Sequence, residues 1–472
     1  MSASENIHLF NTLTRQKERF RPIENGKVRM YTCGPTVYDY AHIGNFRSFV
    51  FEDILRRWLE YRGFQVTQVM NLTDVDDRTI NASRREGVSL SEHTARYIKS
   101  FFEDLQALNI EKAEYYPRAT ENIPEMVALI NKLIDRGYAY VSEEGSIYYD
   151  ISKFDHYGQL SKIKVEELKA GARVKVDEYE KEEATDFALW KAWDESDGNV
   201  YWETGIGKGR PGWHIECSAM AMKYLGEQLD IHTGGVDNMF PHHENEIAQT
   251  EAVTGKKFVN YWLHCEHLLV DGKRMGKRFG NYYTFRDLVK LGHDPKAIRY
   301  LLISTHYRQQ FNFTFEGLEA AKRATERLVN FAYRLMEADG MAHDEVNQLV
   351  VEARKKFSDA MDNDLDIGTA LAGLFDLIRD ANNILDKNEI SHEQAQRVYE
   401  LIMQFDRVLG IIGEVKKPKE LSKEAQELIQ KREEARRKKD WNEADRIRKE
   451  LREIGIIVED TPDGVRWRIK ES

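Results

Sequence analysis

The sequence predicts an α/β protein in which a doubly wound parallel sheet carrying an insertion is followed by an α-helical bundle and a small mixed C-terminal domain. A strand–loop–helix–strand pattern at residues 28–70 indicates the sheet, and the pattern resumes at residue 229. From about residue 317, apolar residues repeat at helical spacing, which predicts the bundle. A chain of 472 residues is long enough for two to four domains of about 100–200 residues each.

The first half of the sheet is predicted from residues 28–70. Residues 28–33 form a strand candidate, residues 34–44 are rich in turn formers, apolar residues from Phe46 to Leu59 follow at helical spacing, and a second strand covers 64–70. Ligands of such Rossmann-like sheets bind at the carboxyl ends of the strands. Cys33 and residues 71–74 would lie at that edge.

The second half follows an insertion. Residues near 120–200 are predicted to be mixed, with a short strand at 146–149 and a charged loop at 175–185. The sheet then resumes with a strand at 229–232, the pair Gly234 and Gly235, and a helix that carries His242. Another strand is predicted at 267–270.

The C-terminal third is predicted to be mainly helical. The bundle extends to about residue 415, and Pro418 falls in a lysine-rich linker. One charged helix is expected over 421–453. A hairpin ends the chain, with strands at 456–458 and 465–469 around a turn at 461–464.

Composition is typical of a globular protein, with 41% hydrophobic and 32% charged residues. No apolar run approaches the roughly 20 residues of a membrane span, and the N-terminal residues lack the basic and apolar regions of a secretion signal. Three cysteines exclude a disulfide scaffold and fit a reducing cytosol. We therefore expect a cytoplasmic protein that does not enter a membrane.

The net charge is −11, which argues against indiscriminate nucleic-acid binding because that needs a broad basic surface. Basic residues nevertheless gather at 430–439, so a local nucleic-acid contact is still possible on this pattern.

Four separated residues have the side-chain types that zinc prefers: Cys33, Cys217, His242 and Glu246. His242 and Glu246 follow Pro241, which suits the first turn of a helix, and their i,i+4 spacing puts them on one helix face. A single Cys or His is more often a buried structural residue. The set becomes a zinc-site hypothesis because each member lies in a segment with its own functional features.

Two glycine-bearing loops have the character of a nucleotide site. In residues 35–45, between a strand and a helix, His42 and Asn45 can donate to phosphate oxygens, and Gly44 can lie against an adenine. Residues 272–281 are dense in cations, which could stabilise charge that develops on a pyrophosphate leaving group. Judged alone, the second loop is more often a solvated surface loop.

Two further segments border these features. Residues 209–217 end in Cys217, and Trp213 there is equally compatible with a core position and with a wall that faces a substrate. Residues 233–237 follow a strand, so Asp237 can accept hydrogen bonds from ribose hydroxyls.

Together these residues resemble the cysteinyl-tRNA synthetase family of class I aminoacyl-tRNA synthetases over nearly the whole chain. The matching segments are CGPTVYD at 33–39, HIGN at 42–45, NLTDVDD at 71–77, PRAT at 117–120, GWHIECS at 212–218 and FPHHENE at 240–246. The C-terminal KDW at 439–441 and EDTP at 459–462 resemble the family's anticodon-binding end.

The resemblance implies a two-step reaction. L-cysteine and ATP, with Mg²⁺, give cysteinyl-adenylate and pyrophosphate, and the cysteinyl group then passes to the terminal ribose of tRNA(Cys). The family holds one Zn²⁺ on the residues that match the quartet above, and the ion takes the substrate thiolate. Zinc would separate cysteine from serine without an editing domain, because the wrong substrate cannot make that bond. The partners would be tRNA(Cys), L-cysteine and ATP, and the chain would be a monomer.

The resemblance also implies roles for individual residues. The catalytic residues would be His42, Asn45, Lys277 and Arg274, and ATP would be bound by Gly44, Lys277, Gly235 and Asp237. The amino acid would be bound by Gly34, Thr36, Thr73 and Trp213. The anticodon would be read by Arg436, Trp441 and Asp445. Tryptophan stacking and polar edge contacts are the usual means of reading single-stranded bases. The implied segments are a catalytic domain in two halves (1–120 and 201–270), an insertion (121–200), a KMSKS-type loop with a stem-contact region (271–316), the bundle (317–415) and an anticodon-binding domain (416–472).

The chain departs from the family pattern at two motifs. The HIGH-type motif ends in Asn45, where histidine is common, and asparagine can still donate a hydrogen bond. The KMSKS-type loop has Arg274, Gly276 and Arg278 in place of a lysine and two serines, but it keeps Lys277. Cys265 matches no ligand position.

Three alternatives remain at this stage. A ligase that joins cysteine to an amino sugar shares the catalytic core but lacks the anticodon-binding end. A non-catalytic tRNA-binding relative is suggested by the altered loop and disfavoured by Lys277. A zinc hydrolase is disfavoured because four protein ligands leave no evident position for a water nucleophile.

Overall fold

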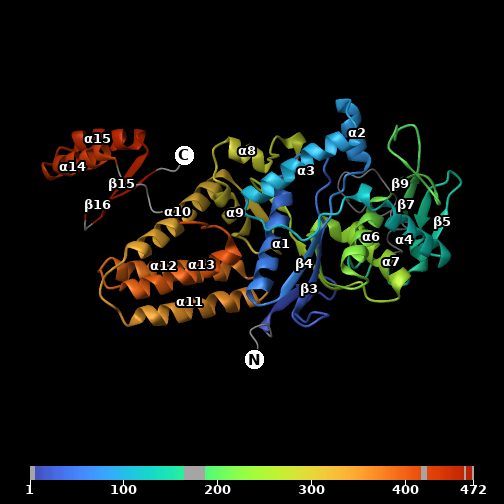
Figure 1. Ribbon diagram of the computed structural model, residues 1–472, viewed down its shortest axis with the longest axis horizontal. Coiled ribbons are helices and arrows are strands. Elements are labelled where there is room, and N and C mark those ends of the chain that lie inside the picture. Colours follow the sequence, from blue (N-terminus) through green and yellow to red (C-terminus); the bar gives the residue numbers. More distant parts are fainter. Residues whose placement is uncertain (1–5, 164–185, 416–421, 462–463, 470–472) are drawn as a thin grey trace. The chain divides into compact units, whose positions relative to one another are not determined.

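The computed structural model describes residues 6–163, 186–415, 422–461 and 464–469 of the chain (Figure 1). The chain forms two compact units, Met1–Gly413 and Glu414–Ser472. The larger unit contains the parallel sheet, the insertion and the bundle, and the smaller one contains two helices and a hairpin.

A parallel sheet of four strands forms the centre of the larger unit. Its order is β11–β10–β3–β4, and all three pairings are parallel. The strands are β3 (Lys27–Thr32), β4 (Gln65–Met70), β10 (Leu229–Gly235) and β11 (Val259–Cys265). The chain order reverses between β3 and β10, so this edge is the switch point at which doubly wound sheets bind ligands. The predicted fold class is confirmed.

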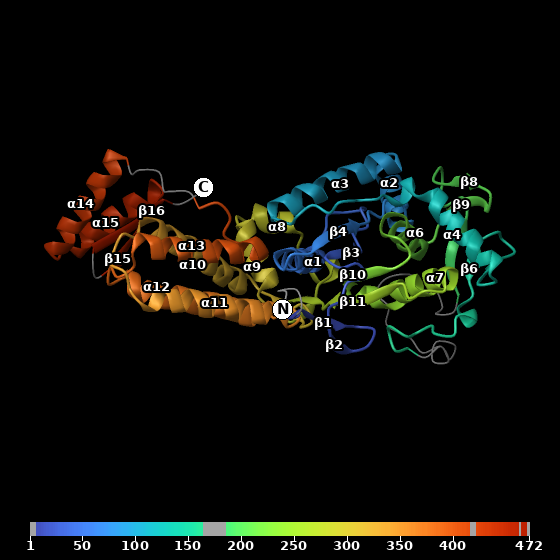
Figure 2. The ribbon, with the colours of Figure 1, turned by 60° about the horizontal axis from the view of Figure 1, so that its bottom comes forward.

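Helices cover both faces of this sheet. Helix α1 (Ile43–Tyr61) packs on β4, β10 and β11, while α6 (Trp213–Leu225) packs against β3 and β4 from the other side, where α7 (Glu244–Thr254) also lies (Figure 2). Phe46, Val50, Leu55 and Trp58 of α1 are buried at the expected helical spacing. Strand β11 is missing from the sequence predictions.

The predicted strand at 267–270 exists as β12, but it belongs to a different sheet. This small sheet has the order β13–β12–β14. Its strands are β12 (Leu268–Val270), β13 (Lys273–Arg274) and β14 (Phe311–Phe313). Two short helices, α8 (Phe285–Lys290) and α9 (Pro295–Ile303), lie between β13 and β14 in the sequence.

In its described residues, the insertion contains a five-stranded antiparallel sheet and an α-helix, and it extends beyond the predicted limit at residue 200 because the strands at 202–204 and 207–211 belong to its sheet. Its order is β5–β6–β7–β9–β8, and α4 (Ile123–Asp135) packs on β5, α6 and α7. The strands are β5 (Ala139–Val141), β6 (Ile147–Tyr149), β7 (Phe187–Ala192), β8 (Trp202–Thr204) and β9 (Gly207–Pro211). The charged loop predicted at 175–185 lies outside the described residues.

The part of the chain before the insertion also contains a hairpin and two helices: β1 (His8–Asn11), β2 (Gln16–Arg19), α2 (Asp77–Glu86) and α3 (Leu90–Ala107).

Four helices form the predicted bundle: α10 (Phe315–Glu337), α11 (Glu345–Asp362), α12 (Ile367–Leu385) and α13 (His392–Leu409). Two buried arginines join it to the sheet domain. Arg299 and Arg57 both bind the Asp53 carboxylate, at 2.5 and 2.8 Å. Arg299 also donates to the carbonyl of Leu409, and Arg57 donates to that of Arg407, at the end of the bundle.

The smaller unit contains α14 (Lys423–Arg437), α15 (Trp441–Glu453) and the antiparallel pair β15 (Ile456–Thr461) and β16 (Gly464–Ile469). The single charged helix predicted over 421–453 is therefore wrong. Lys439 has a φ of 59°, and the Asp440 side chain accepts a hydrogen bond from Glu443 N at 3.1 Å, so a new helix begins there. Among the described helices, none has the length and apolar character needed to cross a bilayer.

Candidate active site and metal centre

The site lies at the switch point of the sheet, where β3 and β10 end. Cys33 directly follows β3, and its amide donates to the carbonyl of Thr233 in β10 at 3.3 Å. Gly34 then passes very close to the segment that follows β4. A Cβ at Gly34 would lie 1.8 Å from the Asn71 carbonyl oxygen, so only glycine fits this crossing.

The structure brings the four predicted zinc ligands together. One donor atom each from Cys33, Cys217, His242 and Glu246 lies within 4.8 Å of the others, and all four residues are buried. Cys217 comes from α6 and Glu246 from α7. His242 lies in a π-helical turn (Met239–His243) directly before α7, not inside that helix as predicted, because Phe240 has non-helical φ and ψ values.

A second set of donors shares two of these residues. Cys33 and Glu246 also lie within 4.8 Å of His232 and His243, neither of which was predicted from the sequence. His232 Nε2 is 3.0 Å from Glu246 Oε2, and His243 Nε2 is 3.3 Å from Cys33 Sγ. His232 stands in a predicted strand with apolar neighbours, and His243 adjoins His242. The sequence signal for His232 was its polar ring within a strand that is otherwise expected to be buried.

Two further histidines contact His242 and His243 and orient their rings. His214 Nδ1 lies 2.9 Å from His242 Nδ1, and His264 Nε2 lies 2.8 Å from His243 Nδ1. These contacts leave the Nε2 atoms of His242 and His243 directed at the cluster. Fixing one ring nitrogen through a neighbour is the usual way in which a metal-binding histidine is oriented.

Burial dominates the electrostatics of the cluster. It raises the pKa of the Cys33 thiol and of the Glu246 carboxyl well above their ordinary values, and it lowers the pKa of His242 well below its ordinary value. Within the described ranges, Glu246 Oε1 has no hydrogen-bond partner, although His242 Nε2 lies only 3.2 Å away. A ring nitrogen and a carboxylate oxygen that far apart can both ligate one tetrahedral zinc ion, so the donor types and their spacing fit the metal.

One predicted amino-acid contact, Trp213, lies at this cluster, and two others, Thr36 and Thr73, lie next to each other. The Trp213 ring stacks on His242 with centroids 4.1 Å apart. Thr36 forms a β-bridge with Thr73, and Thr73 Oγ1 donates to the buried Glu216 at 3.1 Å. Trp213 therefore lies at the cluster and is not part of a distant core.

The predicted phosphate contacts cap α1. His42 Nδ1 accepts a hydrogen bond from the amide of Asn45, and Asn45 Oδ1 accepts one from the amide of His42, both at 3.1 Å. A Cβ at Gly44 would touch the His42 ring at 3.0 Å and Met275 at 3.5 Å. The HIGH-type motif and the KMSKS-type loop are therefore neighbours in space.

The cationic loop is folded back onto the first motif. Lys277 Nζ forms an ion pair with Asp39 and lies 5.1 Å from the centre of the Tyr282 ring. The Asn281 side chain accepts from Gly276 N at 2.9 Å and donates to the Arg274 carbonyl at 3.1 Å, which closes the loop. The remaining predicted residues, Gly235 and Asp237, lie at the end of β10, where a Cβ on the glycine would meet the aspartate oxygen at 2.3 Å.

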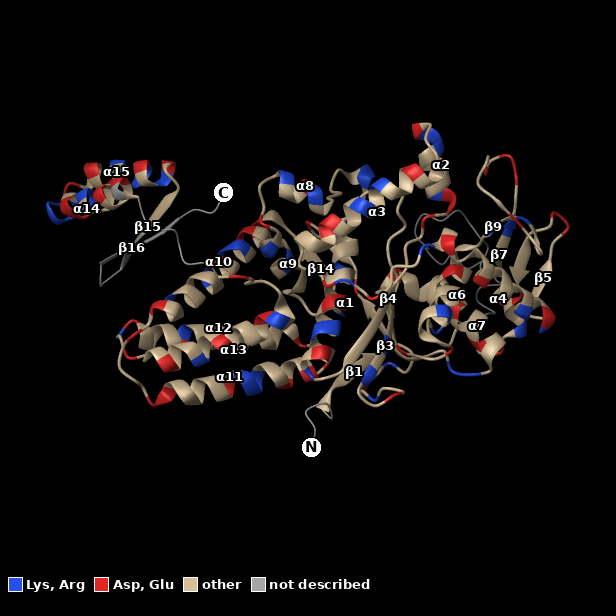
Figure 3. Ribbon diagram, viewed as in Figure 1, with Lys and Arg blue, Asp and Glu red and all other residues tan. Residues whose placement is uncertain are grey.

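Arg436, Trp441 and Asp445 belong to the smaller unit. Arg436 lies near the end of α14, and Trp441 and Asp445 lie on α15. The Trp441 residue is 58% exposed, so its ring is available for stacking. Basic and acidic residues both lie along these two helices (Figure 3).

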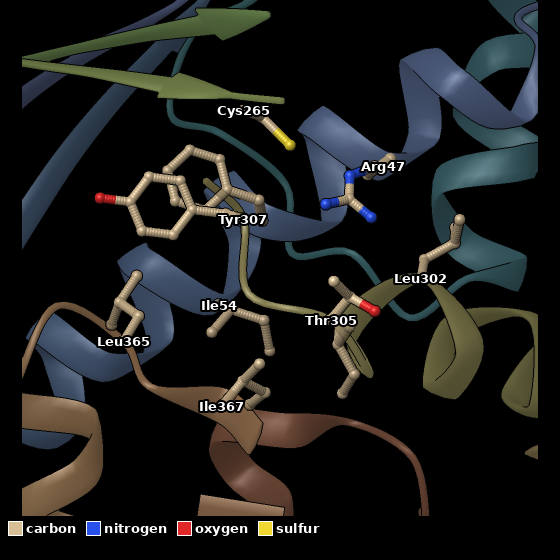
Figure 4. Close-up of a pocket in the computed structure, with 10 residues that line it drawn as sticks. Arg47, Ile54, Cys265, Leu302, Thr305, Tyr307, Leu365 and Ile367 are labelled. Atoms are coloured by element: carbon tan, nitrogen blue, oxygen red, sulfur yellow. The ribbon is translucent and has the colours of Figure 1, made fainter. Parts of the chain in front are cut away.

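Cys265 lies in a different cavity. This cavity is lined mostly by apolar side chains, with Cys265 beside the Arg47 guanidinium and with Ile54, Leu302 and Ile367 around it (Figure 4). Among the described residues, Cys265 is in neither donor set.

Three family models match the chain. The model of the class I (C) tRNA synthetase catalytic domain matches residues 19–323, the DALR domain matches 356–413, and the cysteinyl-tRNA ligase anticodon-binding domain matches 419–468. The last match counts against the amino-sugar ligase, which lacks such an end.

Curated relatives match over the full length. A cysteine–tRNA ligase of Protochlamydia amoebophila is 50% identical over 466 residues, with 98% of each chain covered. One of Brachyspira hyodysenteriae is 48% identical over 480 residues, covering 99% of this chain and all of the relative.

Solved structures share the fold at low identity. Mycobacterium tuberculosis methionyl-tRNA synthetase with methionyl-adenylate has a TM-score of 0.59 at 14% identity, over 81% of this chain and 89% of its own. The ternary complex of Agrobacterium radiobacter K84 LeuRS has a TM-score of 0.60 at 12% identity, over 83% and 85%. With this fold, the catalytic and anticodon-binding models and full-length relatives near 50% identity, the chain belongs to the cysteine–tRNA ligase family of class I aminoacyl-tRNA synthetases and is a ligase.

Proposed function

We propose that this ligase activates L-cysteine with ATP, selects it through a zinc ion, and transfers it to tRNA(Cys). The observation that supports this most strongly is the buried donor cluster at the switch point of the sheet, next to the capped start of α1. An amino acid held at the cluster and a nucleotide held at the helix would meet at the same strand ends.

Cys33, Cys217, His242 and Glu246 would hold the zinc ion. When bound, zinc supplies a Lewis acid that binds a thiolate well and lowers the pKa of the thiol, which serine cannot imitate. The likeness to the family favours this set, since His214 orients His242 and His264 orients His243 in the same way. His232 and His243 would then orient Glu246 and Cys33 from behind.

The substrate would lie between the cluster and α1. Trp213 would form an apolar wall, and Thr36, Thr73 and Gly34 would line the path of the amino and carboxylate groups. His42, Asn45 and Gly44 would receive the ATP phosphates at the helix N-terminus, and Gly235 with Asp237 would contact the adenosine.

The chemistry needs positioning and charge stabilisation more than proton transfer. A carboxylate oxygen of cysteine attacks the α-phosphorus of ATP, and the bond to the pyrophosphate oxygen breaks. Lys277, with Arg274 nearby, would stabilise the negative charge on the leaving pyrophosphate and its Mg²⁺. In the second step a terminal ribose hydroxyl would attack the carbonyl carbon, the bond from that carbon to the AMP phosphate oxygen would break, and the leaving phosphate would take the hydroxyl proton.

For Lys277 to act, its ion pair with Asp39 must open or move with the loop. The Lys277 side chain is 62% exposed, so the ion pair adds little stability and ATP phosphates can compete with Asp39 for the lysine. Arg436, Trp441 and Asp445 would read the anticodon bases. We further propose a cytoplasmic monomer.

A charging assay tests the activity, and zinc content tests the ligand set. Purified protein should charge a cysteine-anticodon tRNA with labelled cysteine and not with labelled serine. Cys217→Ala and His242→Ala should each lower zinc per chain, measured by elemental analysis, at least tenfold. His243→Ala should retain more metal than either, since it is outside the preferred set.

The results test separately whether zinc selects the thiolate and which donor set holds the ion. Charging of serine by the zinc-loaded protein would contradict thiolate selection. If His243→Ala or His232→Ala loses the metal while Cys217→Ala keeps it, the second donor set is the correct one.

A further inference from the structure

A basic hollow opens at helix α2, outside the residues assigned above. It has a volume of about 630 Å³ and is lined by Tyr38, Arg78, Asn81, Arg84 and Arg85. Among the described residues, no carboxylate lines it. Three guanidinium groups around one hollow stand out in a chain whose net charge is −11.

The acidic residues of α2 are engaged elsewhere. Asp77 forms ion pairs with Lys191 and Arg210 of the insertion, and Glu86 forms one with Arg96. These partners neutralise the two carboxylates, so they do not offset the arginines of the hollow.

Two of the arginines bind only carbonyl oxygens in the described part of the chain. Arg84 donates to the Ser196 carbonyl, and Arg85 Nε donates to the Asn81 carbonyl at 3.3 Å. Asn81, Arg84 and Arg85 are exposed and stand at i, i+3 and i+4, so they share one helix face. Blue segments mark this helix in Figure 3.

The hollow adjoins the active site through Tyr38. Arg78 lies over the Tyr38 ring at 5.5 Å, and the Tyr38 carbonyl is fixed at 3.1 Å from His93 Nε2. The next residue is Asp39, the partner of Lys277. Tyr38 therefore links the arginines of the hollow to the residue that pairs with Lys277.

We propose that this hollow holds the phosphodiester groups of the single-stranded 3′ end of the tRNA while its terminal ribose reaches the adenylate. This inference rests on the proposed function. Arginine forks bind phosphate oxygens in pairs, and an aromatic ring beside them offers a face on which a base can stack. ATP is a poorer occupant, because its phosphates are expected at His42 and Lys277.

Arg85→Glu tests the proposal, with Lys257→Glu as the control that changes the net charge equally. Lys257 is exposed and precedes β11, at the opposite edge of the sheet. Arg85→Glu should raise the KM for tRNA about tenfold or more, while cysteine-dependent pyrophosphate exchange without tRNA stays within twofold. Arg85→Lys should recover most of the loss.

A binding measurement locates the contact. Full-length tRNA and tRNA lacking its last four nucleotides are titrated against each variant. Arg85→Glu should weaken only the full-length tRNA, and the slope of log K against log salt should become shallower by about one.

Several results would overturn the proposal. One is an equal change in the KM for tRNA in Arg85→Glu and Lys257→Glu. Another is that Arg85→Glu weakens the binding of full-length and shortened tRNA equally. A third is that Arg85→Glu loses as much pyrophosphate exchange as charging. A wild-type chain that neither exchanges nor charges contradicts the proposed function itself, whereas normal charging by Arg85→Glu contradicts only the hollow.

Discussion

Thr233 Oγ1 donates a 2.9 Å hydrogen bond to Glu52 Oε1, and both residues are fully buried. Thr233 lies in β10 just before the glycines of the site, and Glu52 lies in the middle of α1. The other carboxyl oxygen of Glu52 has no hydrogen-bond partner in the part of the chain that the structure describes. An ionisable side chain thus joins α1 and β10, the two elements at which we propose that the nucleotide binds.

We expect the buried Glu52 carboxyl to make the stability of the folded chain depend on pH. Burial raises the pKa of Glu52 from 4.5 to about 8, so the folded chain keeps the proton over a range in which the unfolded chain releases it. Its contribution to the unfolding free energy therefore falls as pH rises from about 4.5 to about 8, by at most about 1.4 kcal/mol per pH unit, and is constant above.

Glu52→Gln keeps an acceptor for Thr233 and cannot ionise. In guanidinium chloride denaturation of the zinc-loaded protein, the variant should gain stability over wild type steadily between pH 5 and 8. Glu103→Gln is the control, because Arg286 lowers the pKa of that exposed carboxyl and moves its titration below the window. A pH-independent difference for Glu52→Gln would contradict the assignment.

Gly34→Ala should be among the most damaging single substitutions. The added Cβ would overlap the Asn71 carbonyl, so β3 and β4 must separate where the site begins. We expect a loss of about 3 kcal/mol in unfolding free energy and little exchange activity. Gly205→Ala, where nothing lies within 4 Å, should change neither quantity. Wild-type stability in Gly34→Ala would show that the crossing is wider than described.

Lys277→Ala should lower the rate of cysteine-dependent pyrophosphate exchange by about 10²–10³-fold, with a small change in the KM for ATP. The reason is that a cation aimed at the leaving group stabilises the transition state more than bound ATP. Lys273→Ala, an exposed lysine of the same loop, is the matched control. Equal effects of the two substitutions would reduce the role of Lys277 to general surface charge.

Asp440→Ala should destabilise α15 by about 1 kcal/mol, because the side chain that accepts from Glu443 N is removed. Amide hydrogen exchange of residues 441–446 would report it as faster exchange of this helix alone. Asp440→Asn keeps a capping oxygen and should behave like wild type. Unchanged exchange in Asp440→Ala would mean that packing alone holds the helix start.

Much of the fold could be predicted because periodicity is local. Apolar spacing in residues 46–59 and 318–335 reports which face of a helix is buried, whatever the remainder of the chain does. Strand β11 was missed because buried parallel strands lack polar alternation, and its Tyr261, Trp262 and His264 do not look like a Val- and Ile-rich run. The break at Asp440 was missed because charged residues surround it on both sides.

The zinc quartet could be proposed because each ligand stands in a distinctive segment. The second donor set could not, since His232 and His243 acquire meaning only when β10 and the turn before α7 are placed against Cys33. Likewise, the capping role of His42 and Asn45 depends on where α1 starts, and spacing alone does not reveal that.

The buried arginines at Asp53 determine where the chain can be cut. A fragment ending near residue 323, the limit of the catalytic-domain match, would strip Arg57 and Arg299 of the carbonyls of Arg407 and Leu409 and leave two cations in an opened interior. A fragment ending at Gly413 keeps every one of these acceptors. We therefore expect a fragment that ends at Gly413 to be more stable than one that ends near residue 323, although Asp53 and the Asn109 carbonyl remain as partners of both arginines in the shorter one.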